Sequence, residues 1–227
     1  MLGAHKPTRR TQQRGLDTRR ELMCAALIEF AAVGFEAAST RAIAGRAGIK
    51  QGQLTYHFET KDELWRATVS YLFERFDEEF AAAIEDLGVT GTGDVASAVE
   101  VSVRALVRVV SRLPELNRVM IHSSTADSGR LEWLVDSHVR PRFEELSAVW
   151  QQVLAEGATH LEADPLVIYY CVLGAASLLY VNAPEAAQLA GSSGVTGVVT
   201  EELVEAHSNT IVAMLLGPRG KFHKKGK

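Results

Sequence analysis

Apolar residues recur at spacings of three and four along most of the chain, which is the pattern of α-helices packed by one face. The first clear case places Leu22, Ala26, Phe30 and Val33 on one face of a helix. A capping box at Thr18–Glu21 opens this helix, and Gly34 ends it. Similar patterns predict helices at Asp94–Arg112, after Pro114, at Arg130–Glu156 with a kink or break at Pro141, at Pro165–Val181 and at Thr200–Leu216. We therefore expect an all-α protein.

The segment Ser39–Lys61 has a different pattern, with two short helices separated by a glycine. Ser39 is suited to cap a helix over Thr40–Ala47, and Gly48 suits a turn that needs a positive φ. A second helix is expected over Gln51–Phe58. A small residue, a glycine and apolar residues at these offsets are typical of a helix-turn-helix.

The outward side of this second helix is polar and aromatic. Its residues are Gln51, Gln53, Thr55, Tyr56 and His57. Glutamine can pair with adenine, threonine can contact a base or the thymine methyl, and tyrosine and histidine can donate to phosphates. A solvated polar helix that packs through Leu54 and Phe58 is the alternative interpretation.

A second capping box, Thr60–Glu63, begins the long helix that follows. Lys61 lies in its first turn, where free N–H groups and the helix dipole attract anions. Lys61 is therefore a candidate phosphate ligand.

Charge is distributed unevenly. The net charge is −4. Residues 1–66 contain 11 Lys and Arg against 7 Asp and Glu, which gives +4, and residues 67–227 contain 13 against 21, which gives −8. A basic N-terminal third on an acidic body is expected of a small DNA-binding head joined to a larger partner domain.

Residues 18–65 resemble the DNA-binding domain of the TetR family of bacterial transcriptional regulators. The resemblance lies in T-R-R-E, A-A-L-I-E-F-A-A-V-G-F, S-T-R-A-I-A-G-R-A-G-I and G-Q-L-T-Y-H-F-E-T-K-D-E-L. It implies phosphate contacts by Ser39, Thr40, Tyr56, His57 and Lys61. It also implies base-facing positions at Arg41, Gln51, Gln53 and Thr55, and a close backbone approach at Gly52; we add Lys50, beside the turn, to the predicted DNA-binding residues.

Two positions depart from the family pattern. The family often has a basic residue where Gln51 stands and an aromatic residue where Thr55 stands. The phosphate-binding set looks intact, whereas the operator sequence cannot be transferred from a relative.

The resemblance implies two further duties for the larger domain, homodimerisation through its last two long helices and binding of a small-molecule effector. The predicted interface residues are Leu166, Tyr170, Leu173, Gly174, Ser177, Val212 and Leu215. The uncharged run Leu166–Val181 supports this role, because its helix has more apolar surface than one small core readily buries. The run has 16 residues, which is short of the ~20 that span a bilayer. A central helix of the monomer is the alternative. The predicted effector-binding residues are Met120, His122, Trp133, His138 and Tyr169, although for each one taken alone plain core or surface is the favoured interpretation.

The expected organisation is a flexible basic arm (1–17), a three-helix helix-turn-helix DNA-binding head (18–65), a larger helical ligand-binding and dimerisation domain (66–218) and a basic disordered tail (219–227). Cys24 and Cys171 are far apart in apolar surroundings, which predicts buried thiols in a reducing compartment, here the cytoplasm. No catalytic motif, metal-ligand spacing or cofactor loop is present in the sequence.

We therefore expect a homodimeric repressor, not an enzyme, that needs no cofactor or metal and leaves a palindromic double-stranded operator when an effector binds. A ligand-dependent activator of the same fold is the first alternative. A helical enzyme and a protein-interaction module are the others.

Overall fold

The computed structural model describes residues 9–88, 93–124, 129–191, 194 and 197–217. Regular structure in these residues is helical, without a strand. The chain divides into two units, one made of Met1–Glu74 and Arg118–Ala126, the other of Arg75–Asn117 and Asp127–Lys227. The predicted all-α fold, with a three-helix head and a larger helical part, is confirmed.

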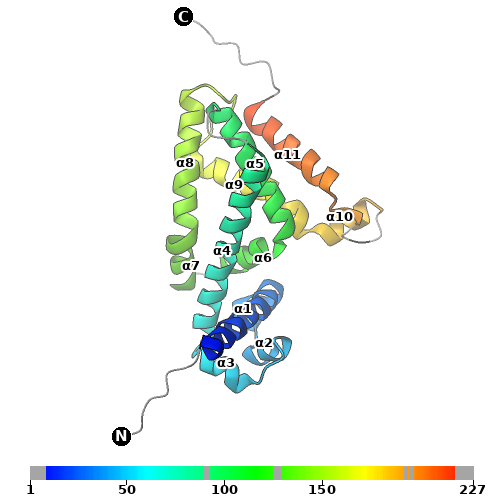
Figure 1. The fold of residues 1–227 in the computed structure, drawn as a ribbon. Helices are drawn as coiled ribbons and strands as arrows, with labels where there is room; N and C mark the ends of the chain where they lie inside the picture. The colour runs from blue at the N-terminus through cyan, green and yellow to red at the C-terminus, as the bar shows by residue number, and fades with distance from the viewer. Residues whose placement is uncertain (1–8, 89–92, 125–128, 192–193, 195–196, 218–227) are drawn as a thin grey trace, which may run out of the picture. The chain divides into compact units, whose positions relative to one another are not determined.

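The first unit contains the N-terminal helices (Figure 1). They are α1 (Arg9–Ala37), α2 (Thr40–Arg46), α3 (Gln51–His57) and the first half of α4 (Lys61–Asp86). Helix α1 begins at Arg9, ahead of the Thr18 capping box, so part of the expected arm is helical. The run R-R-T-Q-Q-R contains good helix formers, and a single Gly15 costs a helix only about 1 kcal/mol. Residues 1–8 lie outside the described residues.

Gly34 interrupts α1 as predicted, because its φ of 74° is unfavourable for other residues. A Cβ atom at this position would also meet Nδ1 of His122 at 3.2 Å. Leu22, Ala26 and Phe30 are buried on the inner face of α1 as expected, whereas Val33 is 45% exposed. The break at Gly34 therefore separates the packed part of α1 from a final single turn.

The second unit is a helical bundle. Its elements are the end of α4, α5 (Val95–Arg112), the start of α6 (Pro114–Ser124), α7 (Gly129–Leu134), the π-helix η1 (Val135–Val139), α8 (Arg140–Ala155), α9 (Pro165–Val181), α10 (Ala183–Leu189) and α11 (Glu201–Leu216). Helices α5, α8, α9 and α11 share one apolar core, which contains Val107, Trp150, Val172 and Ile211. The indole N–H of Trp150 donates to the Ala163 carbonyl at 2.9 Å, so this buried polar group is satisfied.

The helix expected at Arg130–Glu156 is interrupted, as the sequence predicted. Pro141 cannot donate a backbone hydrogen bond, and the preceding turn widens into a π-helix in which the Arg140 N–H donates to the Val135 carbonyl. The sequence patterns predicted no helix between Val181 and Thr200, but Ala183–Leu189 forms the short helix α10 with Pro184 in its first turn.

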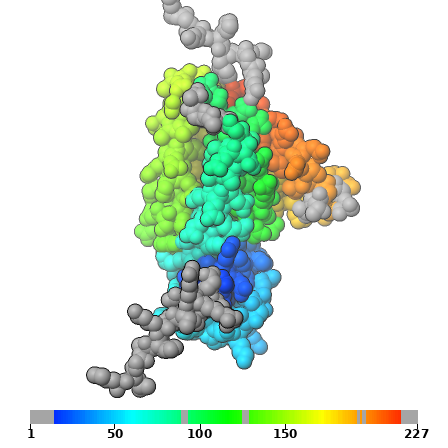
Figure 2. Space-filling model, in the orientation of Figure 1, coloured from blue at the N-terminus to red at the C-terminus, as the bar shows by residue number. Residues whose placement is uncertain are grey.

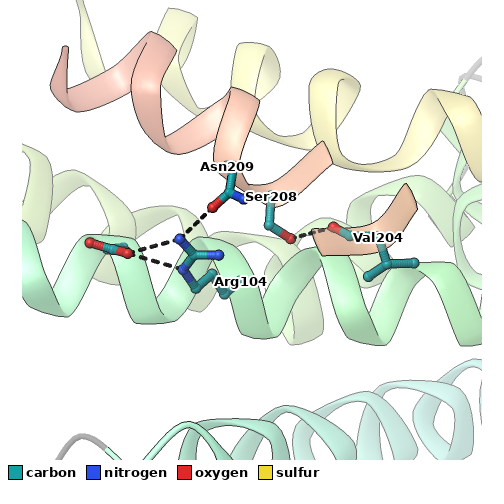
Figure 3. Close-up of polar contacts among 5 residues, drawn as sticks. Arg104, Val204, Ser208 and Asn209 are labelled. Atoms are coloured by element: carbon teal, nitrogen blue, oxygen red, sulfur yellow. Dashed lines mark hydrogen bonds and ion pairs between the residues drawn. The ribbon is translucent and has the colours of Figure 1, made fainter. Parts of the chain in front are cut away.

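The helices α5 and α11 are also joined by polar contacts at the edge of the core (Figure 3). Arg104 pairs with Glu100 at 2.9 Å and donates to the Asn209 side-chain oxygen at 2.6 Å. In Figure 2 the yellow-green α8 and the orange α11 lie at opposite edges of the second unit. No single helix in the described ranges is long and apolar enough for a membrane span; α9 and α10 would qualify only together, and they are bent by 70°.

Candidate DNA-binding surface

The turn between α2 and α3 has the geometry that the sequence predicted. The Ser39 hydroxyl accepts the Ala42 N–H at 3.4 Å and so caps α2. Gly48 has a φ of 70°, and the Ile49 N–H returns to the Ala44 carbonyl at 3.0 Å. The Ser39 bond begins α2, and the turn at Gly48 ends this helix and directs the chain into α3.

The inner side of α3 is fixed by apolar packing. Leu54 and Phe58 are 3% and 1% exposed, and they lie in the same unit as the buried Ile43 of α2. Arg19 of α1 adds a support that the sequence did not reveal. Its guanidinium lies 4.2 Å from the centroid of the Phe58 ring and donates to the His57 carbonyl at 3.1 Å.

The outer side of α3 presents most of the predicted DNA-contacting residues. Gln51, Gly52, Gln53, Thr55 and Tyr56 are exposed, and Tyr56 reaches 86%. An aromatic side chain this exposed has little to pack against within the protomer. The outer side of α3 is therefore polar and aromatic, and the first unit leaves it accessible to a partner.

Two of these side chains also have local partners. The Gln53 side-chain oxygen accepts the Lys50 N–H at 3.2 Å, and the Thr55 hydroxyl donates to the Gln51 carbonyl at 3.2 Å. Gln53 keeps both amide N–H groups for a base, and Thr55 keeps its acceptor lone pairs and its methyl group. Gln51 is the more available glutamine for two-point pairing with adenine.

The remaining predicted residues surround this helix. Ser39, Arg41 and Lys50 are exposed, Thr40 is half-buried, and the half-buried His57 ring packs edge-on against Tyr56 at 5.3 Å. Lys61 differs from them. Its ammonium donates to three backbone carbonyls at the end of α1 and the following turn, those of Phe35, Glu36 and Ala38.

Residues 22–68, which contain α2, α3 and the turn between them, match the family model described as bacterial regulatory proteins, tetR family. This segment of the chain belongs to the TetR family. The HTH-type transcriptional regulator CymR of Pseudomonas putida is 35% identical over 82 residues, 36% of this chain. The match spans 40% of the length of that relative.

Solved structures of other regulators resemble nearly the whole fold of this chain. AibR, solved in complex with isovaleryl coenzyme A and operator DNA, has a TM-score of 0.68 at 19% identity, with 88% of this chain and 99% of that chain covered. A putative fatty acid metabolism regulator of Clostridium perfringens has a TM-score of 0.66 at 14% identity, with 87% and 98% covered. The putative regulator SCO4942 of Streptomyces coelicolor has a TM-score of 0.63 at 19% identity, with 88% and 99% covered. At these identities the likeness concerns the fold.

The residues predicted to bind an effector are divided between the two units. Met120 and His122 belong to the first unit, where His122 lies against Gly34. Trp133, His138 and Tyr169 belong to the second unit. A role of these five residues in effector binding stays a prediction.

Two of the three residues in the second unit, His138 and Tyr169, lie near an arginine that no sequence pattern predicted, Arg142. Trp133 and His138 pack edge-on at 5.2 Å, and Tyr169 packs in the same way on Phe143 at 5.5 Å. Arg142 binds both carboxylate oxygens of Asp77 at 2.6 Å and donates to the His138 carbonyl at 2.6 Å. No periodicity signals this pair, because its partners are 65 positions apart.

Burial and neighbouring charges shift the pKa values of His138 and Tyr169. Burial lowers the pKa of His138 and Arg142 lowers it further, whereas Asp77 acts in the opposite direction. Burial raises the pKa of Tyr169 and Tyr170 raises it further, while Arg142 opposes both. Both side chains are therefore held in their neutral forms near neutral pH. In the described part of the chain no three His, Cys, Asp or Glu side chains are grouped as metal ligands.

The predicted interface residues divide by exposure. Leu166, Tyr170 and Gly174 lie on the exposed face of α9, and Leu173 is half-buried. Ser177, Val212 and Leu215 are buried in the protomer, so we correct their placement on the outer surface. Cys171 is exposed on α9 and Cys24 is only half-buried, so the expectation of two buried thiols is wrong.

Proposed function

We propose that this TetR-family protein is a homodimeric repressor that binds a near-palindromic operator and leaves it when a small molecule binds the second unit. The observation that carries the proposal is the outward face of α3. Gln51, Gln53, Thr55 and Tyr56 are exposed there on a helix whose other side is packed. A helix of this kind fits the major groove, where side-chain amides and hydroxyls can read base edges.

The exposed apolar side of α9 supports the dimer. Leu166, Val167, Tyr170 and Leu178 are each more than half exposed, as is Met214 on α11. A stripe of large apolar side chains is costly in water, and a second copy of the same surface would remove it from water. Two recognition helices would then read two half-sites.

Gly174 gives independent support for a close contact on this stripe. A glycine inside a helix costs about 1 kcal/mol relative to alanine. A Cβ atom at Gly174 would meet nothing within 4 Å in the protomer, so the protomer's own packing does not require the glycine. Close approach of a helix from a second copy would require a glycine at this position.

Coupling between ligand and DNA is supported by chain continuity. Helices α4 and α6 each contribute residues to both units. A ligand that favours one arrangement of either helix therefore biases the DNA-binding unit. Since coupling is reciprocal, an effector that weakens DNA binding must itself bind the DNA complex more weakly.

Selection of operator DNA from a random pool, followed by a screen for small molecules that release it, tests the proposal. We expect an enriched inverted repeat and at least one compound that lowers its affinity. Transcription from a promoter carrying the selected site then gives the sense of regulation. Repression relieved by the compound is expected, and activation by the compound would favour the alternative regulator.

A further inference from the structure

Lys61 is the first residue of α4, a position where its own charge is unfavourable. The amino end of a helix carries partial positive charge, and a cation is disfavoured there. Helix α4 has Asp62 and Glu63 in its first turn, as a helix start prefers. Lys61 is the exception, so its ammonium is expected to act on something other than α4.

The ammonium is directed to the end of α1. It donates to the carbonyls of Phe35 at 2.8 Å, Glu36 at 3.2 Å and Ala38 at 3.1 Å. An ammonium has three N–H donors and no acceptor, so these three bonds use its full capacity. The carbonyl ends of helices lack partners within the helix and favour cations.

An aromatic group holds the ammonium from a second side. Lys61 Nζ lies 4.5 Å from the centroid of the Phe35 ring. That ring stacks on Phe30 at 6.1 Å and meets Trp65 edge-on at 6.2 Å. Phe30 and Trp65 are almost fully buried, so the cation rests against a ring anchored in the core of the first unit.

These contacts fix the segment that leads directly into α2. Gly34 breaks α1, and the following residues through Ala38 form a single turn of chain. The next residue is Ser39, which caps α2, and Thr40 follows as its first residue. The position of both hydroxyls therefore depends on the carbonyls that Lys61 binds.

We propose that Lys61 is a positioning residue, which sets Ser39 and Thr40 for the DNA phosphates and does not itself bind phosphate. This inference rests on the proposed DNA-binding function. It differs from what the sequence predicted, since a phosphate contact would require Lys61 to give up bonds that already satisfy it.

The salt dependence of operator binding separates the two roles. A lysine that neutralises one phosphate contributes about 0.9 to the slope of log affinity against log salt. We expect Lys61→Met to lower operator affinity about tenfold, as loosened charge-assisted hydrogen bonds do, and to leave the parent slope unchanged. Lys50→Met is the matched comparison, because Lys50 is exposed beside α3; its slope is expected to fall by about 0.9.

A charge-conserving variant gives a second test that does not depend on losing the cation. Arginine is a strong phosphate ligand, but its planar fork cannot direct three bonds at the converging carbonyls as an ammonium does. Lys61→Arg is therefore expected to lose affinity although it keeps the charge. Hydrogen exchange should rise at the Ala42 and Ile43 amides, whose bonds to Ser39 begin α2, while the Phe58 amide keeps its protection.

Three results would overturn the inference: a slope for Lys61→Met lowered by about 0.9, parent-like affinity in Lys61→Arg, or unchanged affinity in Lys61→Met. All variants are compared below the unfolding temperature of the least stable one. If the unaltered protein shows no preference for any DNA sequence, the proposed function fails instead, and selection from a random pool identifies this case before any variant is made.

Discussion

The outward faces of α3 and α9 are both exposed, but they expose opposite chemistry. On α3 the exposed side chains are glutamines, a threonine and a tyrosine. On α9 they are leucines, a valine and a tyrosine, with Cys171 and Gly174 between them. The first surface hydrogen-bonds to water when free, whereas the second leaves apolar area in water.

This difference indicates two kinds of partner. A polar face can exchange water for base edges and phosphates at little net cost, which suits binding that must be reversed. An apolar face is costly whenever it is uncovered, which suits a lasting contact with a second copy. We infer that α9 stays covered while α3 binds and releases DNA.

The largest expected effect comes from filling the apolar face. Gly174→Leu adds a side chain where the protomer has open space, so the folded protomer should tolerate it. At a close helix contact the same side chain would hold the copies apart and weaken the dimer about 100-fold, as loss of an interface hot spot does. Sedimentation equilibrium measures the change. Gln151→Leu, at an exposed position of α8, is the control, and equal behaviour of the two variants would remove α9 from the interface.

The two glutamines of α3 provide the next comparison. Gln51→Ala should relax the preference at one base pair by about 1–3 kcal/mol and leave the free energy of unfolding within about 0.5 kcal/mol of the parent. Gln53→Ala should also destabilise the fold by about 0.5–1.5 kcal/mol, because it removes the bond that accepts the Lys50 N–H. Binding to single-substituted operators and urea unfolding measure the two effects. Identical stability of the two variants would mean that the Gln53 cap contributes nothing.

The smallest expected effect is on the pH dependence of stability, and it involves the polar pair formed by Tyr180 and His207. The Tyr180 hydroxyl lies 3.1 Å from Nδ1 of His207, between α9 and α11. Burial lowers the pKa of His207, while a bond to the Ala175 backbone opposes this. The unfolded chain therefore binds a proton at a higher pH than the folded chain does, so stability falls as the pH drops below about 6.5.

His207→Gln should make this acid-side loss shallower. His138 has a lowered pKa for a similar reason and would leave a residual slope. Unfolding temperatures between pH 7.5 and 5.5 provide the measurement. Burial also raises the pKa of Tyr180 to about 12, so its contribution is lost only as the pH rises above about 10. An unchanged acid slope in His207→Gln would show that this histidine titrates alike in both states.

Helix positions were predictable from local chemistry. The bounds of α9 follow from the Asp164 cap, the first-turn Pro165 and the uncharged run after them. The turn at Gly48 and the interruption before Pro141 follow from backbone rules in the same way. Helix α10 was missed because Pro184 and the glycines that follow its short alanine-rich segment suggested a loop.

The orientation of helices and their distant contacts could not be predicted. Helix α9 is apolar nearly all round, so periodicity does not tell its inner from its outer face, and on α11 the buried Val212 and Leu215 were placed on the wrong side. The bonds from Lys61 to the end of α1 and from Arg142 to Asp77 join residues far apart in sequence. Such partners are set by tertiary packing, which no local pattern contains.

The most direct test of the account is the composition of the complex with a selected operator. Native mass spectrometry of the protein with the enriched duplex, together with footprinting, gives the number of chains and the protected bases. We predict that chains bind in pairs, with two protected half-sites related by inversion and spaced by whole turns of about 10 base pairs. A single chain bound with full affinity to one unrepeated site would contradict the account.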